Sequence, residues 1–313
     1  MVDKHKTDMD SQTGLEFSDY LILGGTGLLG SKFVKGLAKS NSVSATYHKK
    51  IPFEFAGVKW RKFDALDFNA QTDLINLIRP KVVINCIALT NVDLCELQPN
   101  LATDLNSNFP RILASICSQY GIYLIHISTD HYESIVRKPR KENDHVFGIN
   151  EYGISKLQGE AAIQEVNSTA LILRTNFFGD SNSDSQTFLN WITENLKRNR
   201  KIQGFTDVDF SPVSISELIK CALDLKDMNF NGIVNVSSNE SITKYDFIRL
   251  VAKVFDLNTD LIEPEISDNV KGRVKRPNYM PLDNSRLSLV LKRKMKSIES
   301  MIEQEQIGKN CKT

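Results

Sequence analysis

The chain has 313 residues, of which 41% are hydrophobic and 25% are charged, and its formal net charge at pH 7 is +1. These values are typical of a globular protein with one large or two modest domains. A nearly neutral charge, without a basic block interleaved with aromatic residues, argues against nucleic acid as a partner.

The sequence also argues against a membrane segment, a disulfide framework and a metal site. Residues 1–17 are polar and lack the apolar centre of a signal peptide, and no apolar run approaches membrane-spanning length. We therefore expect a cytoplasmic protein with a flexible tail at residues 1–17. The cysteines are odd in number and lack CxxC spacing, so we expect free thiols rather than disulfides or a zinc site at Cys86, Cys95, Cys117, Cys221 and Cys311.

A glycine-rich turn follows the first predicted strand. The apolar run Tyr20–Leu23 leads directly into GGTGLLG, after which Phe33, Val34 and Leu37 recur at helical spacing. A glycine turn between a buried strand and a helix can hold a pyrophosphate against free backbone N–H groups. The sequence therefore predicts a dinucleotide site at Gly24, Gly27, Leu28, Leu29 and Gly30.

Strands and helices then alternate along the chain, which predicts a Rossmann-like α/β fold with a doubly wound parallel sheet. The predicted strands are residues 43–47, 58–60, 82–88, 122–127 and 170–173, and we expect the fourth of the chain, 82–88, to be central. The predicted helices are 70–78, 106–120 and 151–166, with a long loop at 131–150.

Beyond Asn176 the alternation loosens, which predicts a smaller substrate-binding lobe. Helices are expected at 188–197, 215–225 and 244–255, with a strand at 232–236. We assign residues 18–178 to the Rossmann-like domain and 179–313 to this C-terminal lobe, and we expect some of its elements to return to the main sheet.

The end of the second strand bears on the choice of dinucleotide. An NAD site commonly has an acid there, whereas an NADP site lacks the acid and supplies cations. This chain has Tyr47, His48 and Lys49. The pattern favours NADPH, with NADH as the alternative.

Tyr152 and Lys156 lie four residues apart on a predicted helix, so their side chains share one face. An ammonium beside a phenol favours the phenolate, and we therefore expect the pKa of Tyr152 to be lowered toward the working pH. The helix follows a strand that ends in Ser128, Thr129 and Asp130, at the edge where doubly wound sheets bind ligands.

These motifs and their order resemble the extended short-chain dehydrogenase/reductases, and more narrowly the dTDP-4-dehydrorhamnose reductase family. The narrower resemblance rests on the segments NCIALTNVD at 85–93, HISTD at 126–130, NEYGISKLQGE at 150–160 and LRT at 173–175. The resemblance implies NAD(P)H-dependent reduction of the 4-keto group of a nucleotide-diphosphate 4-keto-6-deoxy sugar, in the synthesis of a glycan sugar.

The family resemblance also implies roles for individual residues. Thr129 would hold the keto oxygen, Tyr152 would donate the proton, and Lys156 would bind the nicotinamide ribose. Further cofactor contacts are implied for Asp64, Ala65 and Ala88, and substrate contacts for Asp93, Asp130, Asn176 and Arg276. Members of the family often form a homodimer, although no motif here identifies an interface.

Other residues have a structural and a functional interpretation. Glu96 could help Asp93 to bind the sugar, and Arg174 could bind the substrate diphosphate. His126 lies inside an apolar strand and is better explained as a core residue. His131 and His145 lie in the long loop, where exposure is the simpler expectation.

The sequence departs from the family pattern beside the substrate. HYESI follows the Ser-Thr-Asp motif where the family has Tyr-Val-Phe, and DVDFSPV at 207–213 replaces a Gln-x-Gly-x-Pro-Thr stretch. Two alternatives therefore stay open. One is a nucleotide-sugar epimerase or dehydratase; the other is a non-catalytic regulatory subunit, as in the methionine adenosyltransferase β subunit, which resembles the same family.

Overall fold

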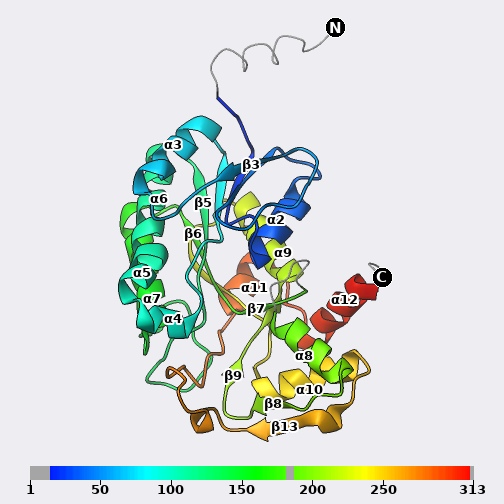
Figure 1. Cartoon of the computed structure of the whole chain (residues 1–313). Helices are drawn as coiled ribbons and strands as arrows, with labels where there is room; N and C mark the ends of the chain where they lie inside the picture. The colour runs from blue at the N-terminus through cyan, green and yellow to red at the C-terminus, as the bar shows by residue number, and fades with distance from the viewer. Residues whose placement is uncertain (1–14, 181–186, 311–313) are drawn as a thin grey trace.

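The computed structural model describes residues 15–180 and 187–310, and its centre is a seven-stranded sheet (Figure 1). All neighbouring strands are parallel, in the order β11-β6-β5-β4-β1-β2-β3. This confirms the predicted doubly wound α/β fold, with β4 in the central place. The strands are β1 (Tyr20–Leu23), β2 (Val43–Tyr47), β3 (Val58–Lys62), β4 (Val82–Asn85), β5 (Tyr123–Ile127), β6 (Leu171–Thr175) and β11 (Gly232–Val236).

Helices cover both faces of the sheet because alternate side chains of each strand enter different cores. Leu21 and Leu23 of β1 pack with α3 (Phe68–Ile78), α6 (Phe109–Gln119) and α7 (Glu151–Val166). Tyr20 and Ile22 pack with helices α2 (Leu28–Leu37) and α9 (Ile215–Asp227) on the opposite face. Two layers of helix therefore exclude water from a sheet with apolar residues on both sides.

Two predicted elements have different bounds in the structure. The strand predicted at 82–88 ends at Asn85, whose side-chain Oδ1 accepts a hydrogen bond from the backbone N–H of Ile87 at 3.0 Å and so starts a turn. The helix predicted at 106–120 begins with a π-helical turn, η1 (Asp104–Asn108), before α6. Two short helices that were not predicted, α4 (Val92–Leu97) and α5 (Pro99–Thr103), precede it.

The C-terminal part of the chain builds a smaller lobe below the sheet in the view of Figure 1. It contains α8 (Phe188–Lys197), α10 (Lys244–Val254) and α12 (Ile298–Asn310), and three two-stranded sheets. The strand pairs are β7 (Phe177–Phe178) with β10 (Val213–Ser214), β9 (Asp209–Phe210) with β12 (Ile242–Thr243), and β8 (Ile202–Phe205) with β13 (Ile262–Glu265).

The lobe is not separate from the main sheet. Strand β11 lies beside β6, and α9 and α11 (Ser285–Leu291) also follow the predicted boundary but pack near the sheet. One hydrophobic core runs from Phe33 on α2 through Leu218 on α9 to Phe247 on α10. The C-terminal segment therefore supports the sheet as well as forming the lobe.

The described part of the N-terminal segment is attached to the domain. The backbone N–H of Glu16 donates to the carbonyl of Leu77 at 2.7 Å, and its carboxylate pairs with Arg61. Most of the segment predicted as a tail lies outside the described residues. Within residues 15–180 and 187–310, no helix has both the length and the apolar character needed to cross a membrane.

The close packing of α7 on η1 leads to a stability prediction. A Cβ at Gly159 would overlap the backbone carbonyl oxygen of Asn106, so Gly159→Ala must push the helix away from its neighbour. We expect a loss of about 1–3 kcal/mol in the free energy of unfolding, measured by urea denaturation.

Gly36→Ala is the matched control, because Gly36 is an exposed glycine of α2 with open space where the added methyl group would lie. That substitution should leave stability unchanged or raise it by up to about 1 kcal/mol through helix propensity. Equal effects of the two substitutions would contradict a packing restriction at Gly159.

Candidate active site

The glycine turn joins β1 to α2 in a conformation that side chains would disturb. Gly24 has a φ of +76°, and a Cβ at Gly30 would overlap the carbonyl oxygen of Gly24. Gly27 is the N-cap of α2 and makes no side-chain cap hydrogen bond. The first turn of α2, which includes Leu28 and Leu29, therefore has no side chain competing for its backbone N–H groups.

The turn lies at the carboxyl edge of the sheet, close to the end of the next strand. If Gly24 had a Cβ atom, the atoms nearest to it would be those of Cys86 and Ile87, which directly follow β4. Ala88 follows them and is partly buried. Since β5 lies on the other side of β4, its end is two strand spacings, about 10 Å, from the glycine turn.

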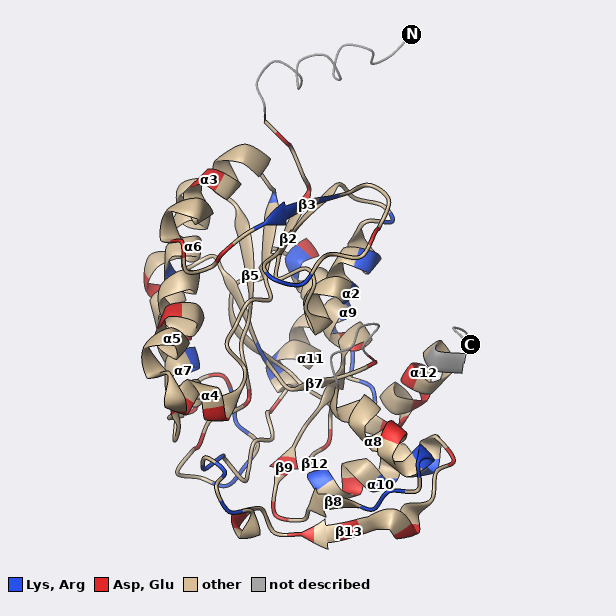
Figure 2. Ribbon diagram, viewed as in Figure 1, with Lys and Arg blue, Asp and Glu red and all other residues tan. Residues whose placement is uncertain are grey.

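The residues after β2 form an exposed, mainly basic edge. Tyr47 is partly buried, while His48 and Lys49 are exposed, and Figure 2 shows further Lys and Arg residues along the adjacent strand β3. Nε2 of His48 lies 3.7 Å from Oδ2 of Asp64, so an acid from beyond β3 does approach this edge. Ala65, next to it, is buried.

Helix α7 brings Tyr152 to the end of β5, where Thr129 lies. Asn150 caps the helix by accepting a hydrogen bond from Gly153 N at 2.9 Å, and Glu96 accepts one from Glu151 N at 3.0 Å. Thr129 is buried, and its side chain lies close enough to the phenol of Tyr152 to influence the pKa of that phenol. The structure thus brings the predicted proton donor and its hydroxyl partner together.

The expected lowering of the Tyr152 pKa is wrong for this structure. Burial raises the pKa of Tyr152 to about 12, and the nearby side chain of Thr129 opposes this only in part. Lys156 does not supply the expected stabilisation because its ammonium turns into the protein, where Nζ donates to the carbonyl of Ile127 at 2.8 Å. Tyr152 is therefore held in its protonated form, the form that donates a proton.

Lys156 is 2% exposed and lies beside the ring of His126. Its Nζ is 3.4 Å from Nε2 of His126. Burial lowers the pKa of Lys156 to about 8, although the nearby carboxylate of Glu160 raises it. His126 is 1% exposed, as expected for a core residue, but it is in polar contact with a predicted catalytic residue.

A second polar group lies behind Thr129. Asp130 is buried, and both of its carboxylate oxygens accept hydrogen bonds from Nδ2 of Asn176, at 3.2 and 2.9 Å. Burial raises the pKa of Asp130 to about 6, opposed first by the charge of Lys244. The predicted substrate residues Asp130 and Asn176 are therefore in direct contact.

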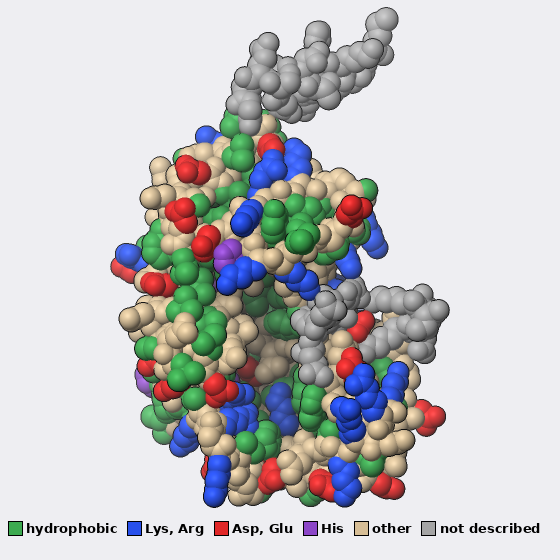
Figure 3. All heavy atoms as spheres, in the orientation of Figure 1, with side chains coloured by type: hydrophobic (Ala, Val, Ile, Leu, Met, Phe, Trp, Pro, Cys, Tyr) green, Lys and Arg blue, Asp and Glu red, His purple; other side chains and the backbone are tan. Residues whose placement is uncertain are grey.

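A cleft of about 1340 Å³ opens between the sheet and the C-terminal lobe, and Figure 3 shows it as a hollow in the surface. From the sheet side it is lined by His131 and Asn176. The ring of His131 meets that of Tyr152 edge to face, with centroids 5.2 Å apart. The cleft therefore begins next to the Thr129 and Tyr152 pair, although the glycine turn does not line it.

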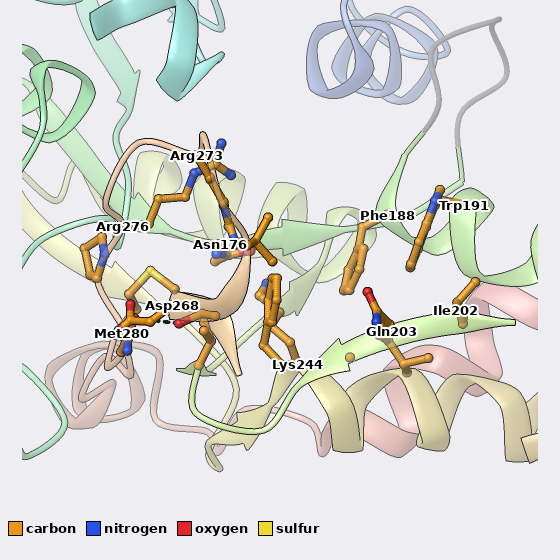
Figure 4. Close-up of a pocket in the computed structure, with 18 of the residues that line it drawn as sticks. Asn176, Phe188, Trp191, Ile202, Gln203, Lys244, Asp268, Arg273, Arg276 and Met280 are labelled. Carbon is orange, nitrogen blue, oxygen red and sulfur yellow. Dashed lines mark hydrogen bonds between the residues drawn. The ribbon is translucent and has the colours of Figure 1, made fainter. Parts of the chain in front are cut away.

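The far wall of the cleft combines aromatic and cationic side chains, as Figure 4 shows. Phe188 and Trp191 of α8 are stacked, with ring centroids 6.0 Å apart. Arg276 donates to Oδ2 of Asp93 at 2.8 Å, so these two predicted substrate residues form an ion pair at the cleft. The guanidinium of Arg273 lies over the ring of Phe205 at 4.9 Å.

Sequence reasoning missed Lys244 and Arg273, which both line the cleft. Lys244 begins α10 directly after its N-cap Thr243, a position where a cation opposes the helix dipole. This unfavourable placement was the one feature of the sequence that could have indicated a functional role for Lys244. Arg273 lies in an irregular segment, and nothing in its local pattern distinguishes it from a surface arginine.

Some other residues have structural roles in this fold. Arg174 pairs with Glu160 inside the protein, with Nη2 donating to Oε2 at 2.6 Å, so the suggested diphosphate contact is wrong. His145 is exposed. Among the described residues no cluster of His, Cys, Asp and Glu could hold a metal ion, and the described cysteines are free; Cys311 lies outside them.

Comparison with known proteins identifies relatives of this chain. The family model for the RmlD substrate binding domain matches residues 18–306. The probable low-salt glycan biosynthesis reductase Agl14 of Haloferax volcanii is 33% identical over 270 residues, which cover 84% of this chain and 89% of that protein. The methionine adenosyltransferase 2 subunit beta of Xenopus laevis is 30% identical over 277 residues, which cover 85% and 80%.

A solved structure shares the fold along nearly the whole chain. The dTDP-4-dehydrorhamnose reductase from Bacillus anthracis, in complex with NADP, matches with a TM-score of 0.80 at 23% identity, covering 94% of this chain and 99% of that one. Its likeness supports the Rossmann-like architecture described above. Since the family model extends from residue 18 to residue 306, the protein belongs to the RmlD substrate binding domain family.

Proposed function

We propose that the protein is an NADPH-dependent reductase of the 4-keto group of a nucleotide-diphosphate 4-keto-6-deoxy sugar, acting in the synthesis of a glycan sugar. The observation that carries this proposal is the position of Tyr152, which lies near Thr129 and packs its ring against His131, a residue that lines a large cleft. The relation to Agl14, whose name describes a glycan biosynthesis reductase, supports the same reaction class.

The residues of the glycine turn fit a dinucleotide. A side chain at Gly30 would overlap the carbonyl oxygen of Gly24 and disrupt the turn. The uncapped start of α2 has N–H groups suited to a pyrophosphate. Gly24, Gly27 and Gly30 would hold the cofactor, with Ala88 passing beside it and Asp64 and Ala65 near the adenine. When bound, NADPH supplies a hydride to the keto carbon of the substrate.

The protein's own groups would handle the proton. Tyr152 donates its phenolic proton to the keto oxygen, and the Thr129 hydroxyl holds that oxygen in place by a hydrogen bond. The raised pKa of Tyr152 keeps the donor protonated before reaction. Lys156 lies one helical turn further along α7, and its side chain would turn from the carbonyl of Ile127 toward the cofactor to orient the nicotinamide ribose.

The cleft offers groups for the rest of the nucleotide sugar. Lys244, Arg273 and Arg276 could attract its diphosphate, and the stacked rings of Phe188 and Trp191 provide an apolar wall. Asp130, Asn176 and Asp93 supply polar atoms for sugar hydroxyls. We place the reaction in the cytoplasm and expect a homodimer, as predictions from the sequence.

A regulatory subunit is the second candidate function, because the methionine adenosyltransferase 2 subunit beta is a relative of similar coverage. A reductase oxidises NADPH and exchanges the cofactor in every turnover, whereas a regulatory subunit need not oxidise it. The deciding experiment follows NADPH absorbance with purified protein and a panel of nucleotide-linked 4-keto sugars. Oxidation with one or more of them supports the reductase, and no oxidation with any sugar favours the regulatory role.

Tyr152→Phe tests the proton donor. The substitution removes the phenolic hydroxyl but keeps the ring that contacts His131, so turnover should fall by about 10²–10⁴-fold while the affinity for NADPH changes little. Steady-state kinetics and fluorescence titration of NADPH provide the two measurements. Tyr120→Phe, at the exposed end of α6, is the control and should retain activity; full turnover by Tyr152→Phe would refute the assigned role.

Lys49→Glu tests the choice of dinucleotide. Reversing the charge of an exposed cation after β2 should raise KM for NADPH by about fivefold and affect KM for NADH much less, because only NADPH has a 2′-phosphate. Lys39→Glu makes the same charge change beyond the far end of α2 and should leave both values unchanged. A wild-type protein that clearly prefers NADH would contradict the NADPH assignment.

A further inference from the structure

Three buried side chains from adjacent elements form a polar row behind the cleft. Asn85 ends β4, His126 lies in β5 and Lys156 lies on α7, and they are 1%, 1% and 2% exposed. Nδ2 of Asn85 is 3.1 Å from Nδ1 of His126, and Nε2 of the same ring is 3.4 Å from Nζ of Lys156. The row therefore connects the turn after β4 to a predicted catalytic residue.

The orientation of the Asn85 amide is fixed by the backbone. Its Oδ1 accepts a hydrogen bond from the N–H of Ile87 at 3.0 Å. If the amide were flipped, its NH2 group would face that N–H, and two donors would oppose each other. The NH2 group must therefore face His126, whose Nδ1 has to accept.

This contact determines where the proton of His126 lies. Burial, assisted by the charge of Lys156, lowers the pKa of His126 well below its usual range, so the ring is neutral. A neutral imidazole that accepts at Nδ1 has its proton on Nε2. That N–H points toward Lys156, and an ammonium group has donors but no acceptor.

We propose that Asn85 and His126 are a positioning pair that presents a hydrogen-bond donor to Lys156 and so favours its neutral amine over its ammonium. A neutral amine has a lone pair that can accept from the Nε2–H of His126 while its own N–H donates to the carbonyl of Ile127. The ammonium form satisfies the second contact but opposes the first.

The charged groups around Lys156 have opposing effects. Glu160, on the same helix, favours the ammonium. Its carboxylate is already bound by Arg174 from β6, through Nε and Nη2, and by the hydroxyls of Ser128 and Tyr132. Burial lowers the pKa of Lys156 to about 8, and the donor from His126 acts in the same direction.

The consequence for catalysis rests on the proposed function, whereas the protonation state of Lys156 does not. A lower pKa of Lys156 reduces the average positive charge available to stabilise the Tyr152 phenolate, and it therefore acts in the same direction as the burial that raises the pKa of Tyr152. Asn85 and His126 would thus help to keep Tyr152 protonated before the substrate binds.

Ring-nitrogen NMR of wild-type protein with isotope-labelled histidine tests the pair without any substitution. We expect the signal of His126, assigned by its loss in His126→Gln, to show a neutral ring protonated at Nε2 near pH 7. A ring protonated at Nδ1, or a doubly protonated ring, would overturn the proposal.

Asn85→Leu tests the effect on Lys156 by side-chain NMR of labelled lysine, with the signal assigned by its loss in Lys156→Met. Without the Asn85 donor the ring can move its proton to Nδ1 and accept from the ammonium, so the pKa of Lys156 should rise by about 1 or more. Greater apolar burial alone would lower it, so the direction separates the two effects.

Asn167→Leu is the matched control, since Asn167 is a buried asparagine at the end of α7 that bonds to Ala114 and Thr169. It should leave the pKa of Lys156 unchanged. An unchanged or lower pKa of Lys156 in Asn85→Leu would overturn the pair even if NADPH is oxidised. Conversely, the expected NMR results without NADPH oxidation would support the pair and refute the reductase.

Discussion

The site depends on the way helix α7 is held against the sheet by contacts that are shielded from water. The carboxylate of Glu160 is bound by Arg174 from β6, and Gly159 allows the backbone of η1 to approach within van der Waals contact. A buried charge is costly when it loses its partner, so the pair strongly favours one position of the helix. The position of the helix in turn places Tyr152 beside the cleft and Lys156 inside the protein.

Burial, rather than the neighbouring ammonium, dominates the electrostatics of the free site. The pKa of Tyr152 is raised, while those of Lys156 and Lys244 are lowered, each chiefly because the charged form is removed from water. Burial raises the pKa of Asp130 for the same reason. Several groups in and beside the cleft therefore have a reduced preference for the charged form, a state that suits proton transfer and the binding of a charged ligand.

The sequence predicted the start of the sheet well because the buried strand Tyr20–Leu23 is a short apolar run and the helix Leu28–Leu37 has a clear period. It could also place Thr129, Tyr152 and Lys156 at one edge. It could not show that Lys156 turns toward Ile127, that Arg174 is paired internally, or that Lys244 reaches the cleft. These facts depend on which side chains meet across distant segments, and local spacing does not contain that information.

Strand β11 has a consequence for how the architecture can vary. It comes from the second half of the chain yet completes the sheet by pairing along the whole length of β6. A polypeptide ending after Phe178 would leave the main-chain groups of β6 unpaired at an open margin, a surface prone to intermolecular association. A C-terminal lobe exchanged between related proteins would therefore have to include β11. The sheet and the lobe consequently form one structural unit rather than two modules that can be exchanged separately.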